Sequence, residues 1–192
     1  MINLLMFGPP GAGKGTQAQL LAAQFRLRHL STGDIFRSEM GQGTELGRAA
    51  RTYIEKGMLV PDEITVGMLR GYLKPDPAFR GFILDGFPRT IAQAEALDRL
   101  LGEWDSGITR VFSLEVPDEE LKKRLRQRAL TSGRSDDADE NVIEHRLEVY
   151  RKETLPLKAY YARQGLLEEV KGVGSIEEIF SDICNRIRQL GI

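Results

Sequence analysis

The feature that most constrains this chain is a glycine-rich segment, GPPGAGKGT, at residues 8–16. An apolar run at residues 2–7 precedes it, and a helical apolar pattern follows it. These flanks predict a strand, a phosphate-binding loop and a helix in succession. Glycines let successive backbone N–H groups converge, and a helix N-terminus carries about half a positive charge. We therefore expect this segment to bind a nucleoside triphosphate, with Lys14 reaching its outer phosphates.

Beyond this loop, predicted strands alternate with predicted helices. The strands are expected near residues 28–30, 81–85, 110–116 and 166–170, and helical patterns lie between them. Asp34 is expected to cap a helix. The segment at residues 35–58 is expected to form two short helices that are interrupted near Gly41 and Gly43, and the longest helix is expected from residue 139 to about residue 163. Such alternation favours a parallel sheet that is covered by helices on both faces. We therefore predict an α/β fold of the P-loop NTPase type, with a five-stranded parallel sheet flanked by helices in one domain over residues 1–192.

Composition limits the partners that we expect. The formal net charge is −1, so no global positive field draws the chain to nucleic acid or to an acidic membrane. No segment approaches the roughly 20 apolar residues of a membrane span, and the run at residues 2–7 is too short for a signal peptide. The single cysteine, Cys184, cannot form an internal disulfide or a thiolate zinc site. These observations favour a cytoplasmic protein, expected to be a monomer, with no nucleic-acid or membrane partner.

Charged side chains follow two of the predicted strands. Arg37 lies three residues beyond Asp34 at a predicted helix start, and Arg89 follows Asp85, which ends the strand near 81–85. The guanidinium group of arginine binds phosphate through two parallel hydrogen bonds. Asp85 is placed to hold Mg²⁺, through water, as acids at this position do in phosphate-loop enzymes.

Five motifs together resemble the adenylate kinase family along essentially the whole chain. They are GPPGAGKGTQA, LSTGDIFR, GMLVPDE, ILDGFPRT with Gln93 behind it, and GRSDD followed by HRLEVY. They occur in the family's order and at nearly its spacing. The resemblance implies Mg²⁺-dependent phosphoryl transfer between ATP and AMP. It also implies a helical NMP-binding flap at residues 31–60 and a short lid at residues 128–138.

The resemblance assigns roles to individual residues. Catalytic roles are implied for arginines and a lysine around the transferred group: Lys14, Arg89, Arg124, Arg134 and Arg146. The implied ATP contacts are Gly11, Ala12, Gly13, Lys14, Gly15, Thr16, Arg128 and Gly174. The implied AMP contacts are Thr32, Arg37, Met58, Leu59, Val60, Gly86, Phe87, Pro88, Arg89, Gln93, Arg134 and Arg146. The family also has a cis-proline turn that Phe87 and Pro88 match, and an amide at Gln93 offers adenine both a donor and an acceptor.

Two departures from common patterns are visible. The general phosphate-loop pattern has Ser or Thr directly after its lysine, whereas Gly15 here separates Lys14 from Thr16. Many bacterial relatives carry a long lid, sometimes with a four-cysteine zinc site, between the positions of Arg128 and Arg134. This chain has only five residues there and no cysteine among them, so we expect a short lid without zinc.

Two other functions have to be weighed against adenylate kinase. UMP/CMP kinases also have a short lid, but they usually carry alanine at the position of Thr32 and asparagine at that of Thr90. A switch protein that hydrolyses nucleotide slowly is the second alternative, but it has no need of arginines gathered from four separate segments. Adenylate kinase is therefore the preferred interpretation, and UMP/CMP kinase is the alternative.

Overall fold

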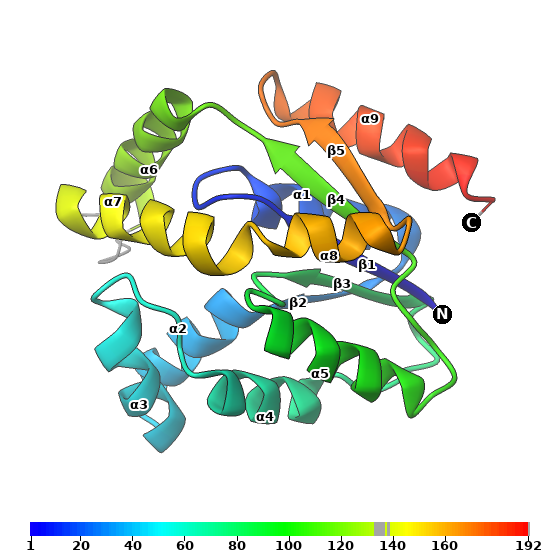
Figure 1. Cartoon of the computed structure of the whole chain (residues 1–192), viewed down its shortest axis with the longest axis horizontal. Helices are drawn as coiled ribbons and strands as arrows, with labels where there is room; N and C mark the ends of the chain where they lie inside the picture. Colours follow the sequence, from blue (N-terminus) through cyan, green and yellow to red (C-terminus); the bar gives the residue numbers. More distant parts are fainter. Residues whose placement is uncertain (133–136, 138, 192) are drawn as a thin grey trace.

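The structure is a computed structural model that describes residues 1–132, 137 and 139–191 (Figure 1). Five strands form one sheet in the order β2-β3-β1-β4-β5. Every pair of neighbouring strands is parallel, as the alternating pattern predicts. The strands are β1 (Ile2–Phe7), β2 (Arg28–Ser31), β3 (Gly81–Asp85), β4 (Arg110–Glu115) and β5 (Leu167–Lys171). Because the strands are parallel, their carboxyl ends share one edge of the sheet.

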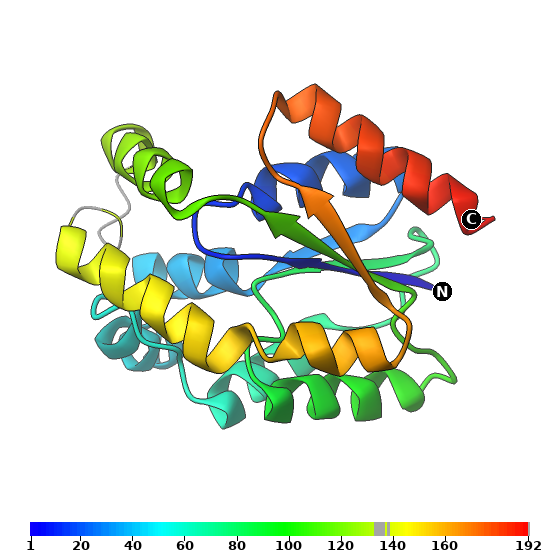
Figure 2. The same ribbon diagram turned by 45° about the horizontal axis from the view of Figure 1, so that its top comes forward.

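Helices cover both faces of this sheet, and Figure 2 shows α1 and α9 on one side with α5 and α8 on the other. The helices are α1 (Lys14–Phe25), α2 (Thr32–Gln42), α3 (Glu45–Ile54), α4 (Asp62–Tyr72), α5 (Ile91–Gly102), α6 (Asp118–Ser132), α7 (Glu140–Val149), α8 (Leu157–Arg163) and α9 (Ile176–Gln189). Short connections join most of them to the strands, so residues that follow a strand lie near the carboxyl edge.

The central strand divides its side chains between two cores. Leu4 and Met6 pack with the residues of α1 and α9, whereas Leu5 and Phe7 pack with those of α5 and α8. Successive side chains of a strand point to opposite faces, so a strand that is buried on both faces must be apolar throughout. All six residues of β1 are buried, and this burial holds the end of β1 and the loop that follows it in place.

The flap segment has a small core of its own. Phe36, Ala50, Val60 and Met68 are buried together between α2, α3 and α4. The first two of these helices approach so closely that a Cβ atom at Gly47 would lie 2.2 Å from the carbonyl oxygen of Glu39. The two helices are separated near residue 43, as the glycines there predict.

Two local predictions were wrong. The helix expected from residue 139 to 163 is divided into α7, a π-helical turn (Tyr150–Thr154) and α8, because Pro156 lacks the N–H group that would continue a helix. The cap of α2 is Ser31, whose hydroxyl accepts from the backbone N–H of Asp34 at 3.2 Å. Asp34, which we expected to cap this helix, instead lies in its first turn and binds Arg37.

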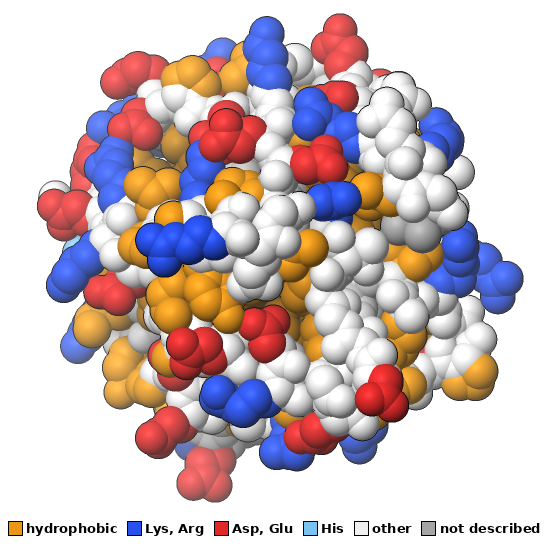
Figure 3. Space-filling model, turned by 45° about the vertical axis from the view of Figure 1, so that its right-hand side comes forward, with side chains coloured by type: hydrophobic (Ala, Val, Ile, Leu, Met, Phe, Trp, Pro, Cys, Tyr) orange, Lys and Arg blue, Asp and Glu red, His pale blue; other side chains and the backbone are white. Residues whose placement is uncertain are grey.

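Charged side chains of both signs are dispersed over the surface, as the face in Figure 3 illustrates. Apolar atoms occur between them in small groups on that face. Among the residues that the structure describes, no helix is both long and apolar enough to cross a membrane.

Candidate active site

A cavity of about 380 Å³ opens at the carboxyl ends of β1, β2 and β3. It brings together nearly all of the residues that the sequence assigned to ATP, AMP or Mg²⁺. Those lining it are Gly11, Gly13, Lys14, Gly15, Thr16, Thr32, Arg37, Met58, Leu59, Val60, Asp85, Gly86, Phe87, Pro88, Arg89, Gln93, Arg124, Arg128 and Arg146. Ala12 and Gly174 do not line this cavity, and Arg134 lies outside the described residues. The roles assigned to all of these residues, inside the cavity or outside it, stay predictions.

The phosphate loop (residues 8–13) curves around the N-terminus of α1. Gly11 and Gly13 have φ angles of +84° and +95°, which side chains disfavour. Gly13 is the cap residue of α1, and it has no side chain that could accept a hydrogen bond from the N–H groups of the first turn. The N–H groups of that turn therefore remain available for an anion, where the helix dipole also favours negative charge.

Lys14 is the first residue of α1, and its ammonium group is turned toward the backbone of the phosphate loop. Its Nζ donates to the carbonyl oxygen of Pro9 at 2.9 Å. Burial lowers the pKa of Lys14 to about 8, Asp85 opposes this effect, and the nearby arginines add to it. A phosphate group beside Nζ would supply the negative charge that the ammonium ion lacks here.

Asp85 ends β3 and lies against the first turn of α1. A Cβ atom at Gly15 would lie only 3.2 Å from Oδ2 of Asp85. The glycine that follows Lys14 thus lets the carboxylate approach the phosphate loop, which gives this departure from the general pattern a structural reason. One carboxylate beside a phosphate site suits Mg²⁺, since this ion usually keeps several waters and binds substrate phosphates. No cluster of three His, Cys, Asp or Glu side chains able to hold a metal occurs within residues 1–132, 137 and 139–191.

The acceptor side of the cavity is built around the carbonyl oxygen of Gly86. That oxygen accepts from Oγ1 of Thr32 at 2.9 Å and from Nε of Arg89 at 2.7 Å. The next peptide bond, Phe87–Pro88, is cis, as the resemblance implies. Arg37, from α2, lines the same cavity, and its Nη2 donates to Oδ1 of Asp34 at 2.5 Å. Two guanidinium groups from different segments therefore line one cavity, as two-sided binding of a phosphate requires.

Gln93 lines the same cavity, but its side chain is held by the protein. Nε2 donates to Oδ1 of Asp62 at 2.7 Å, and Oε1 accepts from the backbone N–H of Arg89, also at 2.7 Å. Only 1% of Gln93 is exposed. The sequence placed Gln93 in the site but did not identify Asp62 as its partner, although Asp62 belongs to the GMLVPDE motif.

The lid side of the cavity is organised by Asp137, for which the sequence suggested no role. Arg128 donates to both of its carboxylate oxygens, at 2.5 and 2.8 Å, and Nη1 of Arg146 donates to Oδ1 at 2.5 Å. Burial alone would raise the pKa of Asp137, but the hydrogen bonds and charges of the two arginines outweigh it and lower the pKa. The GRSDD motif marks this position, yet only the fold brings it to Arg128 and Arg146.

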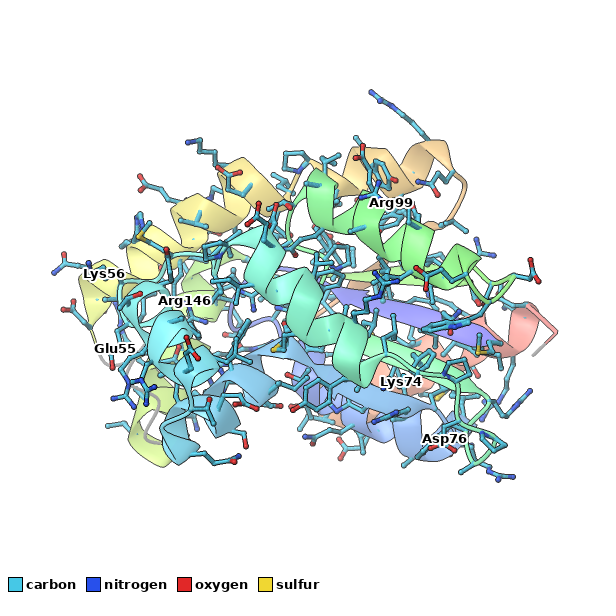
Figure 4. All side chains as sticks on the ribbon, turned by 90° about the horizontal axis from the view of Figure 1, so that it is seen from below. Glu55, Lys56, Lys74, Asp76, Arg99 and Arg146 are labelled. Carbon is cyan, nitrogen blue, oxygen red and sulfur yellow. The ribbon has the colours of Figure 1, made fainter. Side chains whose placement is uncertain are left out.

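Arg124 and Arg146 reach the cavity from different helices. Arg124 lies on α6, and its Nη1 donates to the carbonyl oxygen of Gly172 at 3.0 Å. Arg146 lies on α7 close to the flap, since a Cβ atom at Gly57 would lie 2.8 Å from its Cγ. Figure 4 shows Arg146 beside Glu55 and Lys56, whereas Arg99 lies at the far end of α5.

A phosphate loop and arginines from several segments, gathered around one cavity, define the class. The chain is a phosphotransferase of the nucleoside monophosphate kinase class. The family model described as "Adenylate kinase" matches residues 6–166. The chain belongs to the adenylate kinase family.

Curated relatives agree with this assignment. A protein named adenylate kinase from Thermobifida fusca is 51% identical over 178 residues, which cover 93% of this chain and 94% of that protein. Proteins of the same name from Parabacteroides distasonis and Flavobacterium psychrophilum are 50% and 47% identical over 190 residues. Those matches cover 99% of this chain and 100% of each relative. The comparisons support adenylate kinase rather than UMP/CMP kinase, which was the alternative from the sequence.

Proposed function

We propose that this protein catalyses the reversible, Mg²⁺-dependent transfer of a phosphoryl group from ATP to AMP, forming two molecules of ADP. The observation that carries the proposal is the single cavity that the phosphate loop shares with Arg37 and Arg89. Donor and acceptor phosphates bound at these two positions would lie close together. Holding two reactants in one geometry removes much of the entropic barrier to their reaction.

The donor binds at the phosphate loop in this proposal. The N–H groups of the first turn of α1 and the ammonium group of Lys14 hold its phosphates. Bound Mg²⁺ would neutralise phosphate charge, with Asp85 holding the ion through water. Arg128 and the backbone at Gly174 bind the nucleoside of ATP, as the resemblance implies.

The acceptor binds beneath the flap at residues 31–60. Arg37 and Arg89 hold the AMP phosphate between them, and Thr32 borders it from the start of α2. The backbone at residues 58–60 lines the ribose and base, and the amide of Gln93 forms hydrogen bonds with the edge of the adenine ring. Met58 lines the cavity and is 45% exposed, so its side chain is available to contact a base.

Arginines stabilise the group in transfer. Phosphoryl transfer needs little covalent chemistry from the protein, so positioning and positive charge dominate. Arg124 and Arg146 line the cavity from α6 and α7, and the resemblance adds Arg134, which lies outside the described residues. The short lid at residues 128–138 is proposed to close over the site and exclude water that would compete for the phosphoryl group.

The sequence also favours a cytoplasmic monomer, and we keep this as part of the proposal. Light scattering on the purified protein tests the monomer. A mass near the 21.6 kDa of one chain is the expected result, and a stable multiple would contradict it.

The substitution Arg89→Ala tests the proposed acceptor site. Because Arg89 is proposed to hold the phosphate in both ground and transition states, its loss is expected to lower kcat/KM for AMP by at least about a hundredfold. Arg99→Ala is the matched control, since Arg99 is an exposed arginine of the following helix, far from the cavity. Both variants should keep the melting temperature of the wild type within a few degrees. Near-normal turnover by Arg89→Ala would refute the assignment.

A further inference from the structure

The two groups that hold the amide of Gln93 can each play only one part in a hydrogen bond. Oδ1 of Asp62 accepts from Nε2, and the backbone N–H of Arg89 donates to Oε1. A carboxylate can only accept and a backbone N–H can only donate. Together they determine which end of the amide is oxygen and which is nitrogen.

Asp62 is itself held in place. It is the first residue of α4, and its Oδ2 accepts from Oγ1 of Thr90 at 2.8 Å. Thr90 is the cap residue of α5 and accepts from the backbone N–H of Gln93 at 3.1 Å. The carboxylate therefore links the N-termini of α4 and α5. Gln93 lines the cavity, whereas Asp62 is not among its lining residues, so Asp62 reaches the acceptor only through Gln93.

We propose that Asp62 is a positioning residue that makes the acceptor site select adenine over 6-oxopurines such as hypoxanthine. The proposal rests on the proposed AMP site at Gln93. After its two bonds to the protein, the amide keeps one N–H and one lone pair for a ligand. Among the described residues, neither is used by a second partner.

The two kinds of purine present opposite patterns to such an amide. Adenine offers a donor at its 6-amino group and an acceptor at N1. Hypoxanthine offers an acceptor at O6 and a donor at N1. An amide that is free to rotate by half a turn can match either base equally well. An amide held in one orientation can match only one of them.

Rotation of Gln93 is opposed at both ends. The rotated amide would place Oε1 against the carboxylate of Asp62 and Nε2 against the N–H of Arg89. Since Gln93 is almost completely buried, water cannot replace either lost bond. One such mismatch in a buried site corresponds to about a tenfold change in an equilibrium constant.

The substitution Asp62→Asn tests the proposal. The asparagine amide has nearly the same shape as the carboxylate but can either accept or donate, so it no longer opposes rotation of Gln93. We measure kcat/KM for AMP and for IMP with MgATP as donor. The ratio of the two values is expected to fall about tenfold in Asp62→Asn, because one of the two mismatches is removed. Glu63→Gln, the same change of charge at the adjacent exposed position, should leave the ratio unchanged.

A merely structural role for Asp62 gives a different result. If Asp62→Asn lowers both kcat/KM values equally, the proposal is overturned. In a Gln93→Ala background, adding Asp62→Asn should leave the ratio unchanged. A further fall would mean that Asp62 acts by another route and would also overturn the proposal. If Asp62→Asn unfolds at the assay temperature, Asp62→Ala replaces it, because alanine also removes the acceptor that opposes rotation of Gln93.

The wild type separates this proposal from the proposed function. A wild type that strongly prefers AMP, together with an unchanged ratio in the variant, overturns only the role of Asp62. A wild type without preference for AMP overturns the acceptor site itself, and the role of Asp62 with it.

Discussion

Replacing Asp137 with asparagine should destabilise the protein markedly, although the change is almost isosteric. The carboxylate is fully buried and accepts three hydrogen bonds from Arg128 and Arg146. In Asp137→Asn one oxygen becomes an NH₂ group that points at a guanidinium donor. The hydrogen bonds from the two arginines then lose the negative charge of the Asp137 carboxylate.

The magnitude follows from those bonds. Hydrogen bonds to charged groups contribute about 1.5–3 kcal/mol each. At least one of the three, the bond from Nε of Arg128 to Oδ2, is lost, and the other two lose the negative charge of their acceptor. The arginine side chains are 31% and 16% exposed, so water recovers part of that loss. We therefore expect the free energy of unfolding to fall by about 2–4 kcal/mol. For a chain of this size, that lowers the melting temperature by about 5–10 °C.

The effect should depend on pH with a definite sign. The pKa of Asp137 is lowered in the folded protein, so the folded state binds this proton more weakly than the unfolded state does. The stabilisation is therefore fully present above the unfolded pKa of about 3.9 and is lost as the pH falls through the lower folded pKa. The difference between wild type and Asp137→Asn should be constant from pH 7 to about pH 5 and shrink below about pH 4.

Urea unfolding of both proteins across this pH range is the assay. Asp139→Asn is the control, because Asp139 caps α7 by accepting from the backbone N–H of Asn141 and asparagine caps equally well. Its stability should match that of the wild type. An Asp137→Asn variant as stable as the wild type at pH 7 would refute the reasoning, and so would a difference that persists unchanged at the lowest pH.

Two further predictions concern Lys14 and zinc. Because the pKa of Lys14 is about 8 in the free protein, kcat/KM for ATP should fall as the pH rises above 8, by up to about tenfold per unit. In Lys14→Arg, whose side chain stays charged, kcat/KM for ATP should not change over about pH 7–9.5. A wild-type kcat/KM that is equally constant over this range would contradict the prediction. A zinc-selective chelator in the presence of excess Mg²⁺ should leave the melting temperature unchanged, and a clear fall would contradict the prediction of a zinc-free lid.

The sheet and the phosphate loop were predictable because their causes are local. A strand buried on both faces is a continuous apolar run, and the loop requires glycines and a lysine at fixed spacing. The cap of α2 and the interrupted helix near Pro156 were less predictable. Pro156 is itself a helix-breaking residue, but the apolar pattern continues on both of its sides and obscures the break.

The contacts that organise the site join residues far apart in the sequence. Asp62 is 31 residues from Gln93, and Thr154, whose hydroxyl donates to the carbonyl oxygen of Arg89 at 2.9 Å, is 65 residues from it. Periodicity cannot pair such residues, because only the packed fold brings them together. Motifs could mark where the site residues lie, but the partner of each side chain came from the structure.

The central claim is that one cavity transfers a phosphoryl group from ATP to AMP. ADP formation from MgATP, measured with AMP, UMP, CMP, GMP or no acceptor, tests it most directly. Rapid ADP formation with AMP is expected, and formation with each other acceptor should be at least about tenfold slower, a difference of about 1.4 kcal/mol in transition-state binding. Preference for UMP or CMP would contradict the acceptor site, and ADP formation that needs no acceptor would contradict the kinase assignment as a whole.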